Sequence, residues 1–582
     1  MNENASNAKN TVRGFIFFAK GGGFTMEKNR KRVMTALLIF MVPVIALTCR
    51  LFYIQILCHD DFKEAATSQY EMAVEGMDTR GQIYDRNMKP LTGGSYQYYY
   101  IIKKERMTPE CENLLALLDG SQIAAADSDY FVYRTETYND EINDKLKNGC
   151  SAYVFRSRSR YSASQPACHL VGYLNQSEKR GVSGLENLFE EKLKADDNTL
   201  ILMADAAGNI LPGAAPSVKN SKRLSETDNS VVTSIELGLQ KKCESLLADV
   251  CSGACLVTDA ASGEILAMAS VPVFDPNQLS GYLTQDSDCL INKSLQAAYP
   301  PGSVFKLVVA AAALENGVCT LSQEYECSGE IEAEGVTVSC STAPEGGHGK
   351  IDMNEAMAKS CNCYFVQLGQ AVGHEKILEM ACRLGLGEEV MKDFPEENSG
   401  YVPYVDETVR QDISNISIGQ GRLLATPLQV AQLTGIIAGG GAGSPLRLLA
   451  GEGAAPASQV VPAGAGPGRL GEVDSAARQV ISPQTASTLQ NLMQSVMTQG
   501  TGSYVKWTVP VWGKSGTAEA TLHGEEVKDC WFTGFCDIDT AEGETRRFVI
   551  TVFVEDGISG SATALPVFKE IVEYLNTHVS DM

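Results

Sequence analysis

Histidine is scarce in this chain, which contains six in 582 residues. Because histidine is the usual side chain that exchanges a proton near neutral pH, a catalytic base has to be sought among other residue types. Basic residues are also outnumbered: 48 Lys and Arg face 71 Asp and Glu, which gives a formal net charge of -23. Binding to nucleic acid depends on cations that neutralise phosphates, so this charge excludes nucleic acid as a partner.

Closely paired cysteines are missing as well. None of the 17 cysteines shows the C-x2-C spacing that marks zinc or iron-sulfur sites, so the sequence predicts no metal and no cofactor. His348, in the segment Gly-Gly-His-Gly-Lys, is interpreted as a loop contact rather than a ligand. With 44% hydrophobic and 20% charged residues the composition is that of a folded protein, and the length predicts two or more domains.

Residues 33–57 form a long apolar stretch, and a membrane-spanning helix needs about 20 residues of this kind. Basic side chains crowd positions 28–32, so the positive-inside bias predicts that residues 1–32 are cytoplasmic and that the chain after the apolar stretch is extracytoplasmic. A cleaved signal peptide is the alternative, but no A-x-A-like site follows the stretch. Residues 1–25 match no targeting pattern, and we expect translation to start at Met26.

The chain after this segment changes character near residue 230. Residues 58–230 mix short β-rich runs with helical patches, which predicts an irregular α+β module. From residue 231 onward a strand, an amphipathic helix and a strand pair around a Ser-Gly turn are predicted, and the chain end reads as a strand followed by a helix. Residues 439–471 are rich in Gly, Ala and Pro and are expected to form a surface loop. These elements suit a sheet covered by helices.

Three short motifs follow one another in the second domain: Ser303-Val-Phe-Lys306, Ser360-Cys-Asn362, and Lys514-Ser-Gly516 followed by Thr517. The pattern S-x-x-K is weak alone, since it recurs at residues 6–9 and 503–506. Context distinguishes the first motif, because Pro300-Pro301-Gly302 ends the preceding structure and lets Ser303 open a helix. Lys306 then lies one turn further along the same face.

The residue types of the three motifs suit nucleophilic catalysis. A serine hydroxyl becomes a nucleophile when a neighbour takes its proton, and Lys306 can do so if burial and a positive charge such as Lys514 lower its pKa. Ser360 and Asn362 are predicted on one helix or at its end, where a hydroxyl can relay a proton; a helix-capping pair is the alternative. Gly516 permits close approach of another backbone to its strand, with a β-bulge as the alternative.

The segments PGSVFK, SCN and KSGTAE resemble the three active-site motifs of penicillin-binding proteins and serine β-lactamases. SIGQGRLLATPLQVAQL and GEILAMASVPVFDPN resemble further parts of the transpeptidase domain. TRGQIYDRNMKPLT (79–92) and HLVGYLNQSEKRGVSGLENLFEEKL (169–193) resemble the pedestal module of class B members, and no stretch resembles the glycosyltransferase domain of class A members. The resemblance implies an α+β protein with a membrane helix, a pedestal at 58–230 and a transpeptidase domain at 231–582, whose mainly antiparallel sheet is flanked by helices.

The resemblance also implies a reaction, the cross-linking of peptidoglycan stem peptides that end in D-Ala-D-Ala. Ser303 would attack the carbonyl of the penultimate D-alanine, Lys306 would be the base, and Ser360 would pass the proton to the departing D-alanine. An amine of a neighbouring stem would then accept the acyl group. β-Lactams are the implied covalent inhibitors, and other wall-synthesis membrane proteins are the implied partners.

The remaining motif residues receive supporting roles from the same resemblance. Asn362 would hold the donor peptide, and Lys514 would keep the network polarised. Ser515 and Thr517 would bind the substrate carboxylate, and the amides of Ser303 and Thr517 would form the oxyanion hole. Val304 stands where the family more usually has Thr, away from the proposed chemistry. A β-lactam hydrolase or receptor and a catalytically silent wall-assembly scaffold are the alternative functions.

Four cysteines lie near the active-site motifs in the sequence. Cys327 and Cys340 bracket a hairpin-like segment on the extracytoplasmic side, and we predict a disulfide between them, with two free thiols as the alternative. Cys361 and Cys363 are two positions apart on a predicted helix, so they are expected to face apart and to pack in the core.

Overall fold

The structure is a computed structural model, and it describes residues 26–57, 71–74, 80–122, 130–175, 178, 180–194, 200–203, 217–218, 230–283, 288–333, 335–392, 394, 396–404, 412–449, 477–522 and 524–579. The expected start at Met26 concerns residues 1–25, which lie outside this range, as does most of the expected loop at 439–471. The chain divides into two compact units, residues 1–74 with 200–217 and residues 75–199 with 218–582. Each is described by itself.

The first unit contains the long apolar helix. Helix α1 (Met26–Phe52) runs into a π-helical turn, Tyr53–Leu57, and Arg32–Ile56 is long and apolar enough to cross a membrane. Side chains of α1 are exposed, which suits a helix whose surroundings are lipid. The same unit holds strand β1 (Glu71–Val74), which pairs antiparallel with β9 (Leu200–Met203). The predicted apolar helix is therefore confirmed.

The second unit begins with a small α+β layer. An antiparallel sheet has the order β4-β5-β3-β6, formed by β4 (Ser121–Gln122), β5 (Tyr130–Thr135), β3 (Ser95–Lys103) and β6 (Tyr153–Ser159). Helices α3 (Pro109–Leu117) and α4 (Asp140–Cys150) share a buried apolar cluster with this sheet. Thr108 and Asn139 cap them, because each side chain accepts a hydrogen bond from the first turn.

A buried ionic network joins the two sequence segments that resemble a class B pedestal. The Arg80 Nε donates to Glu186 Oε2 at 2.6 Å, and its Nη2 donates to Glu190 Oε2 at 2.6 Å. On the other side of the same carboxylate, Arg160 Nε donates to Glu186 Oε1 at 2.6 Å and Tyr161 OH donates at 3.0 Å. A buried carboxylate needs such partners, so Glu186 fixes these segments to one another.

The largest sheet of the second unit has five strands in the order β13-β12-β22-β21-β20, all antiparallel. The strands are β12 (Gly253–Asp259), β13 (Ile265–Val271), β20 (Val511–Leu522), β21 (Glu525–Asp539) and β22 (Thr545–Val554). The predicted strand pair around the Ser-Gly turn is β12 and β13, and β22 is the predicted late strand. The expected α+β fold with an antiparallel sheet is confirmed.

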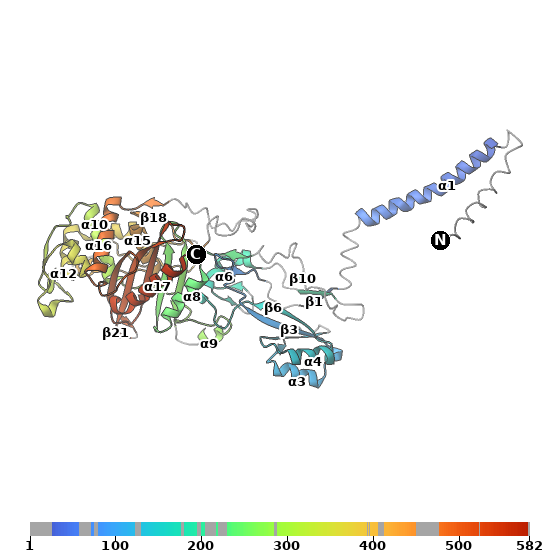
Figure 1. Cartoon of the computed structure of the whole chain (residues 1–582), viewed down its shortest axis with the longest axis horizontal. Helices are drawn as coiled ribbons and strands as arrows, with labels where there is room; N and C mark the ends of the chain where they lie inside the picture. Colours follow the sequence, from blue (N-terminus) through green and yellow to red (C-terminus); the bar gives the residue numbers. More distant parts are fainter. Residues whose placement is uncertain are drawn as a thin grey trace. The chain divides into compact units, whose positions relative to one another are not determined.

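Helices cover both faces of this sheet (Figure 1). Helices α8 (Leu237–Leu247) and α17 (Leu565–His578) pack together against one face, and α15 (Pro427–Ala438) and α16 (Pro483–Thr498) pack against the other. All residues of β12 and β13 are buried, which explains why these strands read as apolar runs instead of alternating ones. Helix α10 (Lys306–Glu315) lies in the core beside α16.

Smaller elements surround the end of the unit that carries the three motifs. Strand β14 (Tyr325–Cys327) pairs with β17 (Gly349–Ile351), and the expected hairpin is present as β15 (Glu330–Ala333) with β16 (Val336–Ser339). Helices α11 (Met353–Ala358), α12 (Asn362–Val372) and α13 (His374–Arg383) follow. Other described short elements include β2 (Ile83–Tyr84), α5 (Cys168–Val171), β7 (Leu174–Asn175), β8 (Arg180–Gly181), α6 (Gly184–Leu188), α7 (Glu190–Leu193), β10 (Ser217–Val218), β11 (Val231–Val232), α9 (Leu279–Leu283), α14 (Asp412–Ser417), β18 (Ala442–Gly443) and β19 (Arg478–Gln479).

Candidate active site

Ser303 lies in a 3₁₀ turn, Gly302–Phe305, that leads directly into α10. The predicted helix start is confirmed, with its first turn wound more tightly than an α-helix. In a 3₁₀ turn side chains three positions apart eclipse one another, so Ser303 and Lys306 share one face. Gly302 N donates to Gly419 O at 2.9 Å and fixes the turn to a neighbouring loop.

Lys306 is fully buried, and its amino group contacts three hydrogen-bond acceptors. Its Nζ donates to Ser360 O at 2.7 Å, to Asn362 Oδ1 at 2.6 Å and to Ser360 Oγ at 3.3 Å. Burial disfavours the ammonium form and lowers the pKa of Lys306 to about 8. Near pH 7 roughly a tenth of an amine with such a pKa is neutral, and this fraction can accept a proton.

Lys514 reaches the same serine from the opposite side. Its Nζ donates to Ser360 Oγ at 3.0 Å and to Ser515 O at 2.7 Å. Burial, and then the charge of Lys306, hold the pKa of Lys514 well below its usual range. Two amines that share one hydroxyl titrate as a pair, because a second positive charge there is unfavourable.

Ser360 occupies a turn between two helices instead of a position on one. Its φ of +54° lies in the left-handed region, which non-glycine residues rarely adopt, so the surrounding contacts have to hold it there. Asn362 is the first residue of α12, and its Nδ2 donates to Ser339 O at 2.8 Å. The cap of α12 is Cys361, whose side chain accepts from Tyr364 N at 3.4 Å, so the capping role considered for Ser360 and Asn362 belongs to the residue between them.

The third motif lies on β20, the edge strand of the large sheet. Pairing with β21 continues without a register shift from Val511 to Leu522, so no bulge occurs at Gly516. A side chain at Gly516 would lie 3.0 Å from Pro301 O, which shows that the strand passes close to the Ser303 turn. Thr517 Oγ1 accepts a hydrogen bond from Gly560 N at 3.1 Å.

The structure thus brings the motif residues together from three separate elements. Lys306, Ser360, Asn362, Lys514 and Ser515 form one hydrogen-bonded group. The Ser303 turn is adjacent to it: a Cβ at Gly302 would lie 2.8 Å from Thr517 O, so the two predicted oxyanion donors lie on neighbouring segments. Two buried amines that contact the Ser360 hydroxyl, with a second serine in the adjacent turn, form an arrangement suited to acyl transfer.

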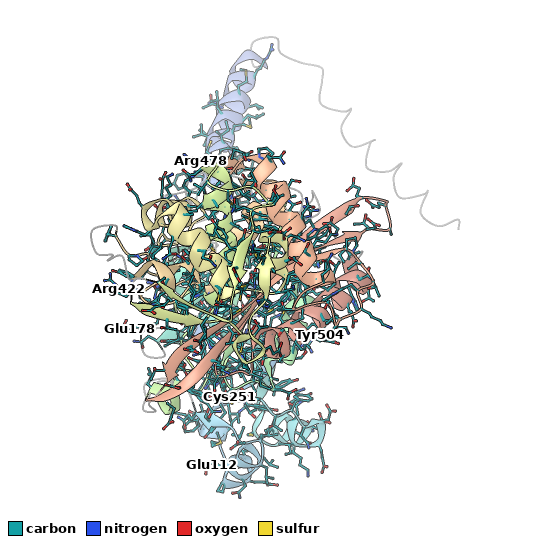
Figure 2. All side chains as sticks on the ribbon, turned by 90° about the vertical axis from the view of Figure 1, so that its left-hand side faces the viewer. Glu112, Glu178, Cys251, Arg422, Arg478 and Tyr504 are labelled. Atoms are coloured by element: carbon teal, nitrogen blue, oxygen red, sulfur yellow. The ribbon has the colours of Figure 1, made fainter. Side chains whose placement is uncertain are left out.

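Sequence reasoning missed two neighbours of this group. Thr501 shares a 2.9 Å hydrogen bond with the Ser515 hydroxyl, and it belongs to none of the motifs. Gly419 contacts the Ser303 turn and belongs to the SIGQG stretch, whose Gly-x-Gly pattern is the signal that could have identified it, since both glycines have a positive φ. Figure 2 looks onto the end of the second unit that carries α12, where the labelled Arg422 and Tyr504 mark the loops of these two residues.

In the structure Cys327 and Cys340 are both free thiols, the alternative considered beside the predicted disulfide. Both sulfurs instead face His348 Nδ1, at 3.5 and 3.6 Å, and Cys340 Sγ lies 3.9 Å from Cys361 Sγ. Cys361 and Cys363 were expected to face apart, yet both approach Cys340. They do so because Cys361 is the cap of α12 and not part of its regular turns.

Comparison with known proteins gives concordant matches. A family model described as the penicillin binding protein transpeptidase domain matches residues 253–573. The penicillin-binding protein PbpB of Mycolicibacterium smegmatis is 30% identical over 495 residues, which cover 80% of this chain and 71% of that protein. The peptidoglycan D,D-transpeptidase MrdA of Acinetobacter baumannii is 26% identical over 637 residues, covering 97% and 88%.

A solved structure shares the fold. The complex between PBP2 and MreC from Helicobacter pylori contains a chain that superimposes with a TM-score of 0.63 at 22% identity. The match covers 88% of this chain and 99% of that one.

Proposed function

This chain belongs to the class B penicillin-binding proteins and is a peptidoglycan D,D-transpeptidase of cell-wall synthesis, and we propose that Ser303 is its nucleophile and Lys306 its base. The observation that carries the proposal is the burial of Lys306 Nζ between Ser360 and Asn362, three residues from Ser303 in a 3₁₀ turn. Burial lowers the pKa of this amine to about 8, which makes it a far better proton acceptor near neutral pH than an ordinary lysine.

Acylation then proceeds by a short proton path. Neutral Lys306 takes the proton of the Ser303 hydroxyl as its Oγ attacks the carbonyl carbon of the penultimate D-alanine. The oxygen of the tetrahedral intermediate is bound by the amides of Ser303 and Thr517, and each such donor contributes about 3 to 4 kcal/mol in other enzymes. Ser360, which contacts both amines, passes a proton to the nitrogen of the leaving D-alanine as the C–N bond breaks.

Substrate binding falls to the remaining motif residues. Ser515 and Thr517, on the edge strand β20, bind the terminal carboxylate of the substrate. Lys514 polarises the hydrogen-bonded network of Ser360 and Lys306 through its contact with the Ser360 hydroxyl. Asn362 holds the donor peptide through its side-chain amide. In the second half-reaction an acceptor amine attacks the ester carbonyl, loses its proton to the same network and releases Ser303 as the free hydroxyl. A β-lactam enters the first half-reaction as a substrate mimic and leaves Ser303 acylated.

Fluorescent penicillin tests this assignment on the full-length chain. We expect stable labelling of the wild-type protein and none of the Ser303→Ala variant. The matched control is Ser503→Ala, which alters the other extracytoplasmic S-x-x-K segment, where Ser503 Oγ only donates to Gly500 O. Equal labelling of the Ser303→Ala protein would overturn the proposal, and absence of labelling in the wild type would favour a silent scaffold. Turnover of the penicillin instead of trapping would favour a hydrolase.

The cellular arrangement is a proposal of the same kind. With basic residues before the apolar helix, we place the N-terminus in the cytoplasm and residues 58–582, with the pedestal at 58–230 and the transpeptidase domain at 231–582, outside the membrane. The PBP2 of Helicobacter pylori forms a complex with MreC. We propose that this chain also associates with wall-synthesis membrane proteins, and that its substrates are stem peptides ending in D-Ala-D-Ala.

A further inference from the structure

Three cysteines and one histidine converge beside the Ser360 turn, and each comes from a different element. Cys327 ends β14, Cys340 follows β16, His348 precedes β17, and Cys361 caps α12. Their ligand atoms, three Sγ and one imidazole nitrogen, all lie within 4.8 Å of one another. All three cysteines are buried, with at most 4% of their surface exposed.

Three of the six separations between these atoms match tetrahedral coordination, and the others are at most 4.8 Å. A zinc ion holds sulfur at about 2.3 Å and nitrogen at about 2.0 Å, so a tetrahedron requires S···S separations of about 3.8 Å and S···N separations of about 3.5 Å. The Sγ atoms of Cys327 and Cys340 lie 3.5 and 3.6 Å from His348 Nδ1, and the Cys340 and Cys361 sulfurs are 3.9 Å apart. The four side chains are therefore preorganised around a common centre.

We propose that Cys327, Cys340, His348 and Cys361 bind a structural Zn²⁺ ion. Three thiolates and an imidazole form a closed four-ligand set, with no position left for water, which is typical of structural rather than catalytic zinc. Soft sulfur ligands also disfavour Mg²⁺ and Ca²⁺, which prefer oxygen. Binding converts three thiols to thiolates and releases their protons to solvent, with no change of oxidation state.

The position of the site connects it to the active site. Cys361 lies between Ser360 and Asn362, both of which contact Lys306 Nζ. Asn362 Nδ2 also donates to Ser339 O, the residue before Cys340. A metal bound here would tie the β15–β16 hairpin to the turn that holds Ser360 at a φ of +54°. This second part of the inference, that zinc positions Ser360 and Asn362 for acylation, rests on the proposed function.

Metal content of the full-length chain, purified in detergent without added chelator, tests the site directly. We expect about one zinc per chain by elemental mass spectrometry, because all four ligands are supplied. Cys340→Ser and Cys361→Ser should lose zinc, and serine at position 361 keeps a good cap for α12. The control, Cys382→Ser, alters an exposed cysteine of α13 and should keep it. Co²⁺ added to the stripped wild type should give the visible spectrum of tetrahedral thiolate coordination.

Labelling by fluorescent penicillin distinguishes the effect of removing zinc from the effect of removing the Ser303 nucleophile. Removing zinc from the wild type should slow labelling about 10- to 100-fold, the cost expected when reacting groups are displaced, and adding zinc should restore it. Ser303→Ala should lose labelling and keep zinc. Zinc absent from a wild-type chain that still labels, or a Cys327–Cys340 disulfide found by alkylation mass spectrometry, would overturn the proposed site and leave the role of Ser303 standing. Unchanged labelling without zinc would overturn the positioning role.

Discussion

At the scale of single residues, the proposed active site contains two lysines whose ammonium groups are buried away from water. Lys306 and Lys514 are both fully buried, and both donate to the Ser360 hydroxyl. A buried ammonium ion loses its hydration by water, and hydrogen bonds to protein groups replace that hydration only in part. Burial therefore favours the neutral amine. The low histidine content is consistent with the proposed mechanism, in which buried Lys306 accepts the proton that histidine accepts in many other enzymes.

The pH dependence of acylation follows from this arrangement. Only the neutral amine of Lys306 can take the Ser303 proton, and its pKa is lowered to about 8. The rate of labelling by a penicillin should therefore rise with pH between about 6 and about 9, with its midpoint near 8, and then level off as the amine becomes fully deprotonated. Stopped-flow measurement of acylation over this range checks the prediction. A rate that is constant, or that falls as the pH rises, would contradict it.

At the scale of elements, the Ser303 turn is held by close backbone packing. Gly419 has a φ of +74°, and a Cβ there would lie 2.1 Å from Gly302 O. The neighbouring Gly421 has a similar φ of +79°, but its Cβ would meet only the Asn415 side chain, at 3.3 Å. The two glycines therefore share the same backbone requirement and differ in whether a side chain would collide with the active-site turn.

Alanine substitutions exploit this difference. Gly421→Ala should lose about 1 to 2 kcal/mol of stability, the cost of a left-handed residue that is not glycine, and Gly419→Ala should lose more, because its Cβ also collides with the Gly302 carbonyl. Only Gly419→Ala should also displace the turn, and it should slow penicillin labelling at least about tenfold. Thermal unfolding and labelling rates of the two variants measure the two effects. Equal labelling rates would show that the turn tolerates the added methyl group.

Elements with a local signal could be predicted from the sequence, and those made by tertiary contact could not. The turn at Ser303 was predictable because Pro300, Pro301 and Gly302 restrict the backbone at that point. The hairpin between Cys327 and Cys340 was predictable from its apolar alternation around a glycine. The meeting of Cys327, Cys340 and Cys361 was not, because their long and unequal spacings acquire meaning only when β14, β16 and α12 pack together. The same holds for Thr501.

At the scale of the whole molecule, one apolar helix is expected to decide where the enzyme is found. The stretch Arg32–Ile56 provides 25 residues, more than the roughly 20 that span a bilayer. The full-length chain should sediment with membranes and require detergent for release. A chain that starts at residue 58 should be soluble and still bind fluorescent penicillin, since the described active-site residues all belong to the second unit. Ultracentrifugation followed by labelling tests this, and a labelled truncated chain in the membrane pellet would contradict it.

The order of strands in the large sheet has a consequence for how the protein is made. Strand β12, formed early in the domain, pairs with β22 across a gap of about 300 positions, from Gly253 to Val554. Such distant pairing slows folding, since a long loop must close before the contact forms. Until the chain has been synthesised and exported as far as residue 554, one edge of β12 has no partner strand. An unpaired strand edge can pair with another chain and so promotes aggregation. A premature stop anywhere before β22 is therefore expected to yield a chain that is degraded, although it already contains Ser303 and Lys306.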